Sequence, residues 1–531
     1  MLDWSIILAA ASGLILFLYG MEQFSREIQK VAGENFRAFL KKATKSTPRA
    51  VLLGCFVTAI AQSSTAVTMI TIGLVDSGLI SFAQSIGIIL GAGIGTTLTA
   101  QLVAIKFTAL GPVFIPLGFL LGIFGGRFAF LGKPLFFFGL VFFGINLVSD
   151  AAAPLKDDPG VMAYLAHLDS VPLAILLGFI LTNVFQSSSV FTGLVVVLSG
   201  NGVLAIWQAI PLILGSNIGT LTPLLASFNL GLFSRRAAAA QLLFNIGGVL
   251  LILPLLHPFT VLIMDFGGSS AQQAANAHTL FNIITTFAFL VVLGPFTRLV
   301  ERLVPGKEEE ILFQTIALDE ELPKENDAAL FRIEEELKYL LAKTESALDE
   351  SASLFPSPGK PAFQRLLKRE ALNDYLDERI EKAILQLSQR KLSQREASRT
   401  VLLVRMSNAL EQLADLAAST GYIANATASR GVPVSAEALA EIGDIHMRLK
   451  DDIRLLKAGF PSISDANVVS MRQNEVWMRE RINAAYANHL KRLYAGKAYA
   501  GSSFVKAMSR LETAHGKLRE IRKLCEIYAK S

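Results

Sequence analysis

The sequence predicts an all-α, polytopic membrane protein with two inverted repeats, re-entrant hairpins and broken helices, followed by a cytoplasmic helical bundle. Three observations predict this class: an uneven distribution of charge, an internal repeat, and apolar segments that are interrupted near their middle. Of the 49 Lys and Arg and the 44 Asp and Glu in the 531 residues, 36 and 34 fall after residue 297. The part before that residue is apolar and long enough for several helical crossings, which need about 20 residues each.

The change of composition divides the chain into three parts. We expect a transmembrane domain at residues 1–297, a linker at 298–330 and a helical domain at 331–531. Positive and negative charges are finely mixed in the last part and the net charge is only +5, so a nucleic-acid partner is not expected. The two cysteines, Cys55 and Cys525, lie in different parts, which excludes a disulfide framework.

An internal repeat relates two parts of the transmembrane domain. Residues 54–102 align without gaps onto residues 178–226 at a constant offset of 124, and we place repeat 1 at about 50–150 and repeat 2 at about 173–297. Packing alone does not call for a polar cluster in the middle of an apolar stretch. The register matches two separate motifs: Gln62-Ser63-Ser64-Thr65 with Gln186-Ser187-Ser188-Ser189, and Ile88 to Thr96 with Leu212 to Thr220.

The order of crossings and hairpins predicts that the repeats are inverted. The runs 51–75 and 173–199, each interrupted by its Gln-Ser-Ser cluster, are expected to be re-entrant hairpins. With the N-terminus outside, most basic connections lie in the cytoplasm. Three crossings separate the hairpins, so the repeats would have opposite orientations, as in alternating-access transporters. The seven expected crossings are Trp4–Tyr19, Phe82–Ile105, Leu110–Phe124, Leu135–Val148, Ala205–Leu230, Ala237–Met264 and Ala277–Leu293.

The Gln-Ser-Ser clusters are candidate anion-binding residues because they interrupt helices within hydrocarbon. An interrupted helix must satisfy its free N–H and C=O groups with protein, water or ligand. The second half-helix of a hairpin presents N–H groups and the positive end of its dipole, which suits an anion such as phosphate. The glutamines would donate to the substrate or brace the turn, and a single Ser or Thr could instead bond to its own helix. The predicted phosphate-binding residues are Gln62, Ser63, Ser64, Thr65, Gln186, Ser187, Ser188 and Ser189.

The second motif of each repeat supplies candidate cation ligands. Glycine lets a helix unwind without a Cβ penalty. The exposed carbonyls and neutral side-chain oxygens would suit an alkali cation better than a divalent ion. Phe244-Asn245 and His278 with Phe281-Asn282 either extend this polar lining or make contacts between helices. The predicted cation-binding residues are Gly95, Thr96, Thr97, Ser216, Asn217, Gly219 and Thr220.

At these residues the sequence resembles the type II sodium-phosphate cotransporter family. That family is marked by a duplicated Gln-Ser-Ser-Ser motif, each copy followed by Gly-x-Asn-Ile-Gly-Thr. The second copy here matches fully, whereas the first has Thr65 for the last serine and Gly93 for the asparagine. The resemblance covers about residues 4–297. It implies sodium-driven phosphate transport across a bacterial inner membrane, with both Gln-Ser-Ser regions contributing to the phosphate and sodium sites.

The helical domain resembles PhoU, a helical-bundle regulator associated with phosphate uptake systems. The resemblance implies metal ligands at Asn373, Asp377, Glu411 and Asp415. The spacing Glu-x-x-x-Asp places two carboxylates on one face of a helix. The equivalent segment of the last helix, 512–516, lacks the second acid. A divalent metal site and a charged pair on a solvated helix are therefore equally good interpretations.

The sequence as a whole predicts a sodium-coupled inorganic phosphate symporter with a cytoplasmic PhoU-like regulatory domain. It contains no nucleophile–base pair, zinc spacing or phosphate-cradling loop in a context that would support an enzyme. Two alternatives remain open: a membrane phosphate sensor that signals through the PhoU-like domain, and a transporter of another oxyanion or a dicarboxylate. The expected partners are phosphate, sodium and the lipid bilayer, and a homodimer and the direction of transport are left open.

Overall fold

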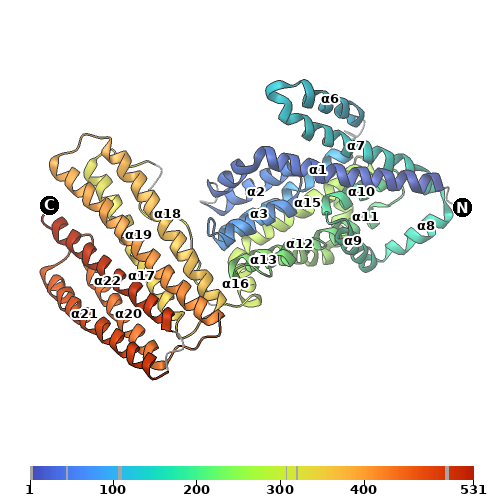
Figure 1. Cartoon of the computed structure of the whole chain (residues 1–531). Helices are drawn as coiled ribbons and strands as arrows, with labels where there is room; N and C mark the ends of the chain where they lie inside the picture. The colour runs from blue at the N-terminus through green and yellow to red at the C-terminus, as the bar shows by residue number, and fades with distance from the viewer. Residues whose placement is uncertain (1–3, 43–45, 106–109, 307, 319–320, 497–500) are drawn as a thin grey trace. The chain divides into compact units, whose positions relative to one another are not determined.

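The computed structural model describes residues 4–42, 46–105, 110–306, 308–318, 321–496 and 501–531, which form helices and connecting segments without a strand (Figure 1). The chain divides into two compact units, Met1–Glu310 and Ile311–Ser531. Among these described residues, six helical stretches of the first unit are long and apolar enough to cross a membrane. The expectation of an all-helical chain with several membrane-spanning segments is therefore confirmed.

The first unit contains sixteen α-helices among its described residues. They are α1 (Trp4–Lys42), α2 (Thr47–Ala61), α3 (Ser64–Asp76), α4 (Phe82–Gly95), α5 (Thr97–Ala104), α6 (Gly111–Phe124), α7 (Gly132–Ala152), α8 (Pro159–Leu165), α9 (Val171–Phe185), α10 (Ser188–Gly200), α11 (Ile206–Ile218), α12 (Thr222–Ser227), α13 (Leu232–Ile252), α14 (Leu256–Asp265), α15 (Ser270–Val291) and α16 (Leu293–Leu303). The six long apolar stretches are Ile6–Ile28, Phe82–Ala104, Gly126–Asp157, Ile206–Ser227, Leu232–Asp265 and Ser270–Val291.

The expected crossing at Leu110–Phe124 differs from the others in length. Helix α6 has 14 residues here, which corresponds to about 21 Å, whereas the hydrocarbon core is about 30 Å thick. It packs closely along α7, since a Cβ on Gly118 would lie 2.3 Å from the backbone nitrogen of Phe136. The expected segment is itself only 15 residues long, so its length already separates it from a full crossing.

The hairpins α2–α3 and α9–α10 begin at opposite ends of the first unit (Figure 1). Helices α1 and α7 run antiparallel, because Gly13 lies against Leu147 and Val148 while Gly20 lies against Val141. The end of α7 therefore lies beside the start of α1. Helix α9 follows from that end through the short α8, whereas α2 begins where α1 ends.

Equivalent glycines hold the first half-helix of each hairpin against the following broken helix. A Cβ on Gly91 of α4 would lie 1.9 Å from the carbonyl oxygen of Val51 in α2. A Cβ on Gly215 of α11 would lie 2.0 Å from the carbonyl oxygen of Ile175 in α9. These two contacts are related by the 124-residue offset, so the aligned residues make the same backbone-to-backbone packing in both halves.

The chain that leaves α16 is tied back to the first unit. The buried guanidinium of Arg236, in α13, donates to the carbonyl oxygens of Val304 and Gly306 at 3.1 and 3.2 Å. The Glu310 carboxylate accepts from the backbone N–H of Phe82, the first residue of α4, at 2.6 Å. These bonds, called the exit tether below, connect Val304, Gly306 and Glu310 to the first turns of α4 and α13.

The described residues of the second unit form a bundle of six long helices. Part of the segment that was expected to be a linker packs into this unit, because Ile311 and Leu318 are buried in its core. The carboxylate of Glu336 also accepts the backbone N–H groups of residues 316–318. The helices are α17 (Asn326–Ser353), α18 (Lys360–Ser388), α19 (Gln394–Ser429), α20 (Ala436–Lys457), α21 (Asp465–Tyr494) and α22 (Gly501–Tyr528).

Candidate functional site

Each hairpin turns at the glutamine of its Gln-Ser-Ser motif. Gln62 and Gln186 are the two described residues other than glycine with a positive φ, at 53° and 56°. Both side chains brace the turn: the amide N–H groups donate to carbonyls three residues earlier, and the amide oxygens accept from Thr99 and Thr222 at 2.6 and 2.7 Å. This left-handed conformation is costly for such a residue and is typical of functional sites.

The serine after each glutamine caps the second half-helix. The hydroxyl oxygen of Ser63 accepts from the N–H of Ala66 at 3.2 Å, and that of Ser187 accepts from the N–H of Val190 at 3.3 Å. Helices α3 and α10 therefore begin at the next serine of each motif. The remaining N–H groups of these first turns, and the positive dipole ends, lie at the turns of the hairpins.

The two Gln-Ser-Ser motifs line one cavity of about 930 Å³, which we call the vestibule. All eight residues that the sequence predicts for phosphate binding contribute to its wall, although they come from two hairpins that lie 124 residues apart in the sequence. The vestibule is lined by Ile15, Leu18, Tyr19, Met21, Glu22, Ser25 and Arg26 of α1, Gln62 to Thr65, and Val184 to Val190.

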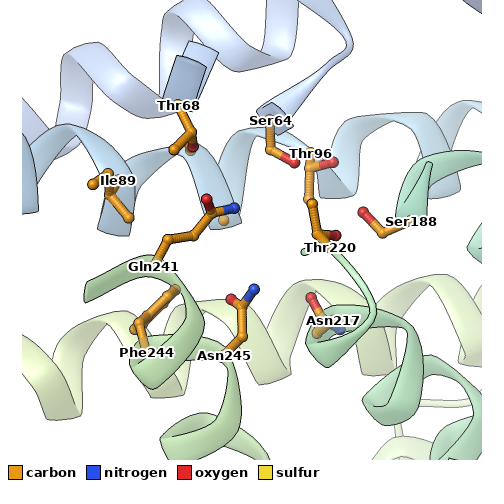
Figure 2. A pocket seen from close by; sticks show the side chains of 12 residues that line it. Ser64, Thr68, Ile89, Thr96, Ser188, Asn217, Thr220, Gln241, Phe244 and Asn245 are labelled. Atoms are coloured by element: carbon orange, nitrogen blue, oxygen red, sulfur yellow. The ribbon is translucent and has the colours of Figure 1, made fainter. Parts of the chain in front are cut away.

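Figure 2 shows the side chains that line a much smaller cavity of about 20 Å³, which we call the inner pocket. Ser64 and Ser188 line both spaces. A cavity must offer about 10–15 Å³ to the centre of a water-sized sphere before it can hold one water molecule. The inner pocket therefore has room for a water or a dehydrated ion. Its lining comprises Ser64, Thr68, Ile89, Ala92, Gly93, Thr96, Ser188, Asn217, Thr220, Gln241, Phe244 and Asn245.

The two repeats touch each other through hydroxyl groups. The Thr96 hydroxyl, at the break between α4 and α5, lies 2.8 Å from the Ser189 hydroxyl in α10. Both side chains are buried. The structure thus brings the second motif of one repeat to the Gln-Ser-Ser motif of the other.

Three of the seven predicted cation ligands line the inner pocket, namely Thr96, Asn217 and Thr220. Gly95 and Gly219 lie outside it and allow close packing of α4 on α2 and of α11 on α9. Thr97 and Ser216 also lie outside: the Thr97 hydroxyl donates across the break to the carbonyl of Ile94 in α4 at 2.8 Å, and the Ser216 hydroxyl donates to the carbonyl of Ile213 in α11 at 2.7 Å. These two residues show the local hydrogen bonding that competes with ligand binding.

Helix α13 contributes two amide side chains, of which the sequence analysis missed Gln241. Figure 2 shows Gln241 and Asn245 pointing from α13 into the space bordered by Ser64 and Asn217. Their spacing of four residues places both amides on one helix face, which was an available signal. His278 is not among the described residues that line the inner pocket. The Asn282 amide donates to the backbone carbonyl of His278 in the same helix, α15.

A difference between the two repeats leaves a polar atom without a partner in the inner pocket, among the described residues. In repeat 2 the Thr192 hydroxyl bonds to that of Ser216 at 3.2 Å. The equivalent positions of repeat 1 are Thr68 and Ala92, and the buried Thr68 hydroxyl finds no hydrogen-bond partner among the described residues. A buried hydroxyl of this kind indicates a site that a water or a ligand fills.

Three carboxylates gather on α18 and α19 of the second unit. Ligand oxygens of Asp374, Glu411 and Asp415 lie within 4.8 Å of one another. Burial, followed by the charges of Asp415, Asp377 and Asp374, raises the pKa of Glu411 to about 7. Divalent cations bind to carboxylate oxygens in such an arrangement, and Asp374 was missed by the sequence analysis.

The other two predicted metal ligands lie outside this group of three. The buried Asn373 amide accepts from the Thr344 hydroxyl at 2.8 Å and donates to the carbonyl of Arg369 at 2.7 Å. The Asp377 carboxylate accepts from the Ser407 hydroxyl at 2.6 Å. Asn373 therefore has a packing role, and the acid next to it in sequence faces the other carboxylates.

We expect Glu411→Gln to stabilise the second unit above pH 7 when no divalent metal is present. The folded-state pKa lies above the ordinary value of 4.5, so the folded protein loses stability as pH rises from about 4.5 through about 7. Calorimetry of the full chain in chelator should show a rise in unfolding temperature of roughly 1–3 °C at pH 8 and none at pH 4.

The matched control is Glu378→Gln on α18. This carboxylate is paired with Lys382, which lowers its pKa, so its removal should not stabilise the protein at pH 8. A divalent cation should raise the unfolding temperature of the wild type at pH 8 and have less effect on Glu411→Gln. Equal unfolding temperatures of wild type and Glu411→Gln at pH 8 would contradict the repulsion between these carboxylates.

Comparison with known proteins finds relatives of the first unit. YqeW of Bacillus subtilis, an uncharacterized protein, is 34% identical over 307 residues, which are 57% of this chain and all of YqeW. YjbB of Escherichia coli K12, named as an inorganic phosphate export protein, is 30% identical over 255 residues, or 47% of each chain. The mouse sodium-dependent phosphate transport protein 2C is 44% identical over 107 residues, 19% of this chain and 18% of its own length.

The family model described as Na+/Pi-cotransporter matches residues 16–150 and 161–292, a span that contains the vestibule and the inner pocket. No solved structure matches the chain. The family consists of transporters, which confirms that the protein is not an enzyme and agrees with its several apolar helices. The chain belongs to the Na+/Pi-cotransporter family.

Proposed function

We propose that the chain is a sodium-coupled transporter of inorganic phosphate that works by alternating access. The observation that carries this proposal is the shared vestibule, because two Gln-Ser-Ser turns from distant parts of the chain line it together. Family membership supports phosphate as the substrate, as do the names of YjbB and of the mouse protein. The last of these names also supports sodium as the coupling ion.

Phosphate would bind at the start of α3 and α10. The hydroxyls of Ser64 and Ser188 lie there beside free backbone N–H groups, and neutral donors of this kind hold an oxyanion at helix N-termini. Gln62 and Gln186 would act mainly by fixing the turns, because both ends of their amides already have protein partners. The vestibule has the volume for a hydrated oxyanion, and the inner pocket does not.

Sodium would bind in the inner pocket. Thr96, Asn217 and Thr220 supply neutral oxygens, and the unpartnered hydroxyl of Thr68 supplies another. A small cavity bordered by neutral oxygen atoms suits a dehydrated monovalent ion, and none of its described lining residues carries a charge. Since Ser64 and Ser188 border both cavities, a bound ion and a bound phosphate would lie close enough to attract each other.

Alternating access is supported by the opposite starting points of the two hairpins. Repeats that enter from opposite ends of the unit, with broken helices meeting between them, are the arrangement found in secondary transporters. Four basic residues lie toward the side where α2 begins: Arg26 in the second half of α1, Arg235 and Arg236 near the start of α13, and Arg298 in α16. By the positive-inside rule that side is cytoplasmic, which leaves the N-terminus outside.

Phosphate flux into proteoliposomes tests the proposal. We expect accumulation of ³²P-phosphate driven by an inward sodium gradient, and no accumulation when potassium or a proton gradient replaces it. A phosphate sensor would bind the anion without accumulating it. Stronger inhibition by sulfate or a dicarboxylate than by unlabelled phosphate would identify a different substrate. Flux measured in both directions would separate uptake from export.

We infer that the second unit is a PhoU-like cytoplasmic regulator of this flux. Its six-helix bundle and the carboxylate group on α18 and α19 support that assignment. The metal ligands that we propose are Asp374, Glu411 and Asp415. Asp377 would not bind the metal directly, since its carboxylate already accepts a hydrogen bond from the Ser407 hydroxyl.

A further inference from the structure

The charge that borders the vestibule lies on α1. Among the residues that the structure describes, Glu22 and Arg26 are the only charged side chains in the vestibule lining. The Gln-Ser-Ser turns offer hydroxyls, amides and helix ends, but no formal positive charge. Within the described part of the chain, an anion that enters this cavity therefore meets one cationic side chain, that of Arg26.

The position of Arg26 follows from the periodicity of α1. Ile15, Leu18, Glu22 and Arg26 recur at three- and four-residue intervals, so they lie on one face of the helix. That face extends about 16 Å from Ile15 to Arg26. Its first half is apolar and its last turn is charged, so Arg26 marks one end of the vestibule.

The guanidinium of Arg26 is held only weakly by its present partner. Its Nη2 atom lies 2.6 Å from the Oε1 atom of Glu22, but the two side chains are 61% and 57% exposed. Exposed ion pairs at this spacing contribute little to stability, so exchange of the carboxylate for another anion costs little. A guanidinium also has further N–H groups in a planar fork that matches the oxygens of phosphate.

We propose that Arg26 is the first residue to bind phosphate in the vestibule. The carboxylate of Glu22 competes with phosphate for the guanidinium and pairs with it again when the phosphate leaves. The proposal rests on the phosphate transport proposed above and adds a positioning role for α1. Arg26 raises the local concentration of the anion by attraction through the open cavity. Glu22 limits how tightly the anion is held there, so that it passes on to Ser64 and Ser188.

Arg26→Gln tests the proposal in proteoliposomes in which the orientation of the protein is known. With phosphate supplied on the side where α1 ends, we expect KM to rise about three- to tenfold at low ionic strength, with little change in the maximal rate. The effect should shrink at high salt, because exposed charges are screened. KM on the opposite side should not change. Arg26→Lys should restore part of the loss, and Glu22→Gln should lower KM.

The matched control is Lys30→Gln, one turn further along α1. The exposed side chain of Lys30 also pairs with a carboxylate at 2.6 Å, that of Glu27, which is only 13% exposed, but Lys30 lines a separate groove against α6 and α7. This variant removes the same charge from the same helix and should leave KM unchanged. An equal rise in KM for Lys30→Gln would indicate a general surface-charge effect and overturn the assignment to Arg26.

Direct binding of inorganic phosphate to the full-length protein in detergent keeps this inference separate from the proposed function. If the wild type binds phosphate without transporting it, the transport proposal fails, and a raised Kd in Arg26→Gln still supports the role of Arg26. If the wild type transports phosphate and Arg26→Gln has the wild-type KM and Kd, the inference is overturned. Absence of both binding and transport in the wild type would overturn both.

Discussion

Gly215→Ala is expected to prevent the second repeat from packing and to destabilise the folded protein by at least about 3 kcal/mol. The added Cβ would lie 2.0 Å from the carbonyl oxygen of Ile175 and 2.8 Å from its carbon. Both obstructing atoms belong to the backbone of α9, so no side-chain rotation can relieve the clash. Helix α11 would have to move away from α9, which would displace Asn217 from the inner pocket.

The measurement is the yield of monodisperse protein in detergent together with its unfolding temperature. Gly91→Ala, the equivalent change in repeat 1, should have a similar effect, since its Cβ would lie 1.9 Å from the carbonyl oxygen of Val51. Gly73→Ala is the matched control, because it lies in α3 with no atom within 4 Å of the new Cβ. It should be neutral or stabilising, as alanine favours helix over glycine. Wild-type stability of Gly215→Ala would refute the close contact of α9 with α11.

Ser188→Ala is expected to reduce phosphate transport about 10- to 100-fold while the protein stays folded. The Ser188 side chain begins α10 and borders both the vestibule and the inner pocket, so its hydroxyl can reach a bound anion. A hydrogen bond to a charged group contributes about 1.5–3 kcal/mol, which corresponds to that loss. Initial rates of sodium-driven ³²P-phosphate uptake give the comparison, with size-exclusion profiles as the check on folding.

Ser227→Ala is the control for this variant. Its hydroxyl is also buried within the first unit, but it donates to the carbonyl of Leu224 at 2.7 Å and lines neither cavity. We expect wild-type uptake. If Ser188→Ala also took up phosphate at the wild-type rate, Ser188 would not be a phosphate-binding residue. The N-terminal ends of α3 and α10 would then be the main groups that bind the anion.

The internal repeat allowed much of the candidate site to be predicted from the sequence. Two polar motifs in one register gave the eight residues that line the vestibule, because an interrupted apolar helix must find polar partners. The same argument did not separate ligands from residues that serve the helix itself. Thr97 and Ser216 carry hydroxyl oxygens of the kind that bind a cation. Whether such a hydroxyl faces the cavity or bonds to a backbone carbonyl three residues earlier depends on how the helix is rotated at the break.

Other parts of the site depend on contacts between elements outside the repeats. Gln241 lies in an apolar helix, and only the packing of α13 brings it to the inner pocket. Glu22 and Arg26 look like an ordinary surface ion pair in the sequence, and the vestibule itself is what gives them an electrostatic role. Asp374 was missed because the resemblance to PhoU indicated its neighbour Asn373, which faces the core instead.

The exit tether determines where a mechanical signal would enter the first unit. Val304 and Gly306 are bonded to Arg236, and Glu310 is bonded to the N–H of Phe82. The helices that bear Arg236 and Phe82 also bear Gln241 and Gly93 of the inner pocket. A displacement of the chain at Glu310 would therefore be transmitted along two rigid helices to the ion-sized cavity. Control of ion occupancy would then require neither a second ligand in the membrane nor a change at the phosphate-binding turns.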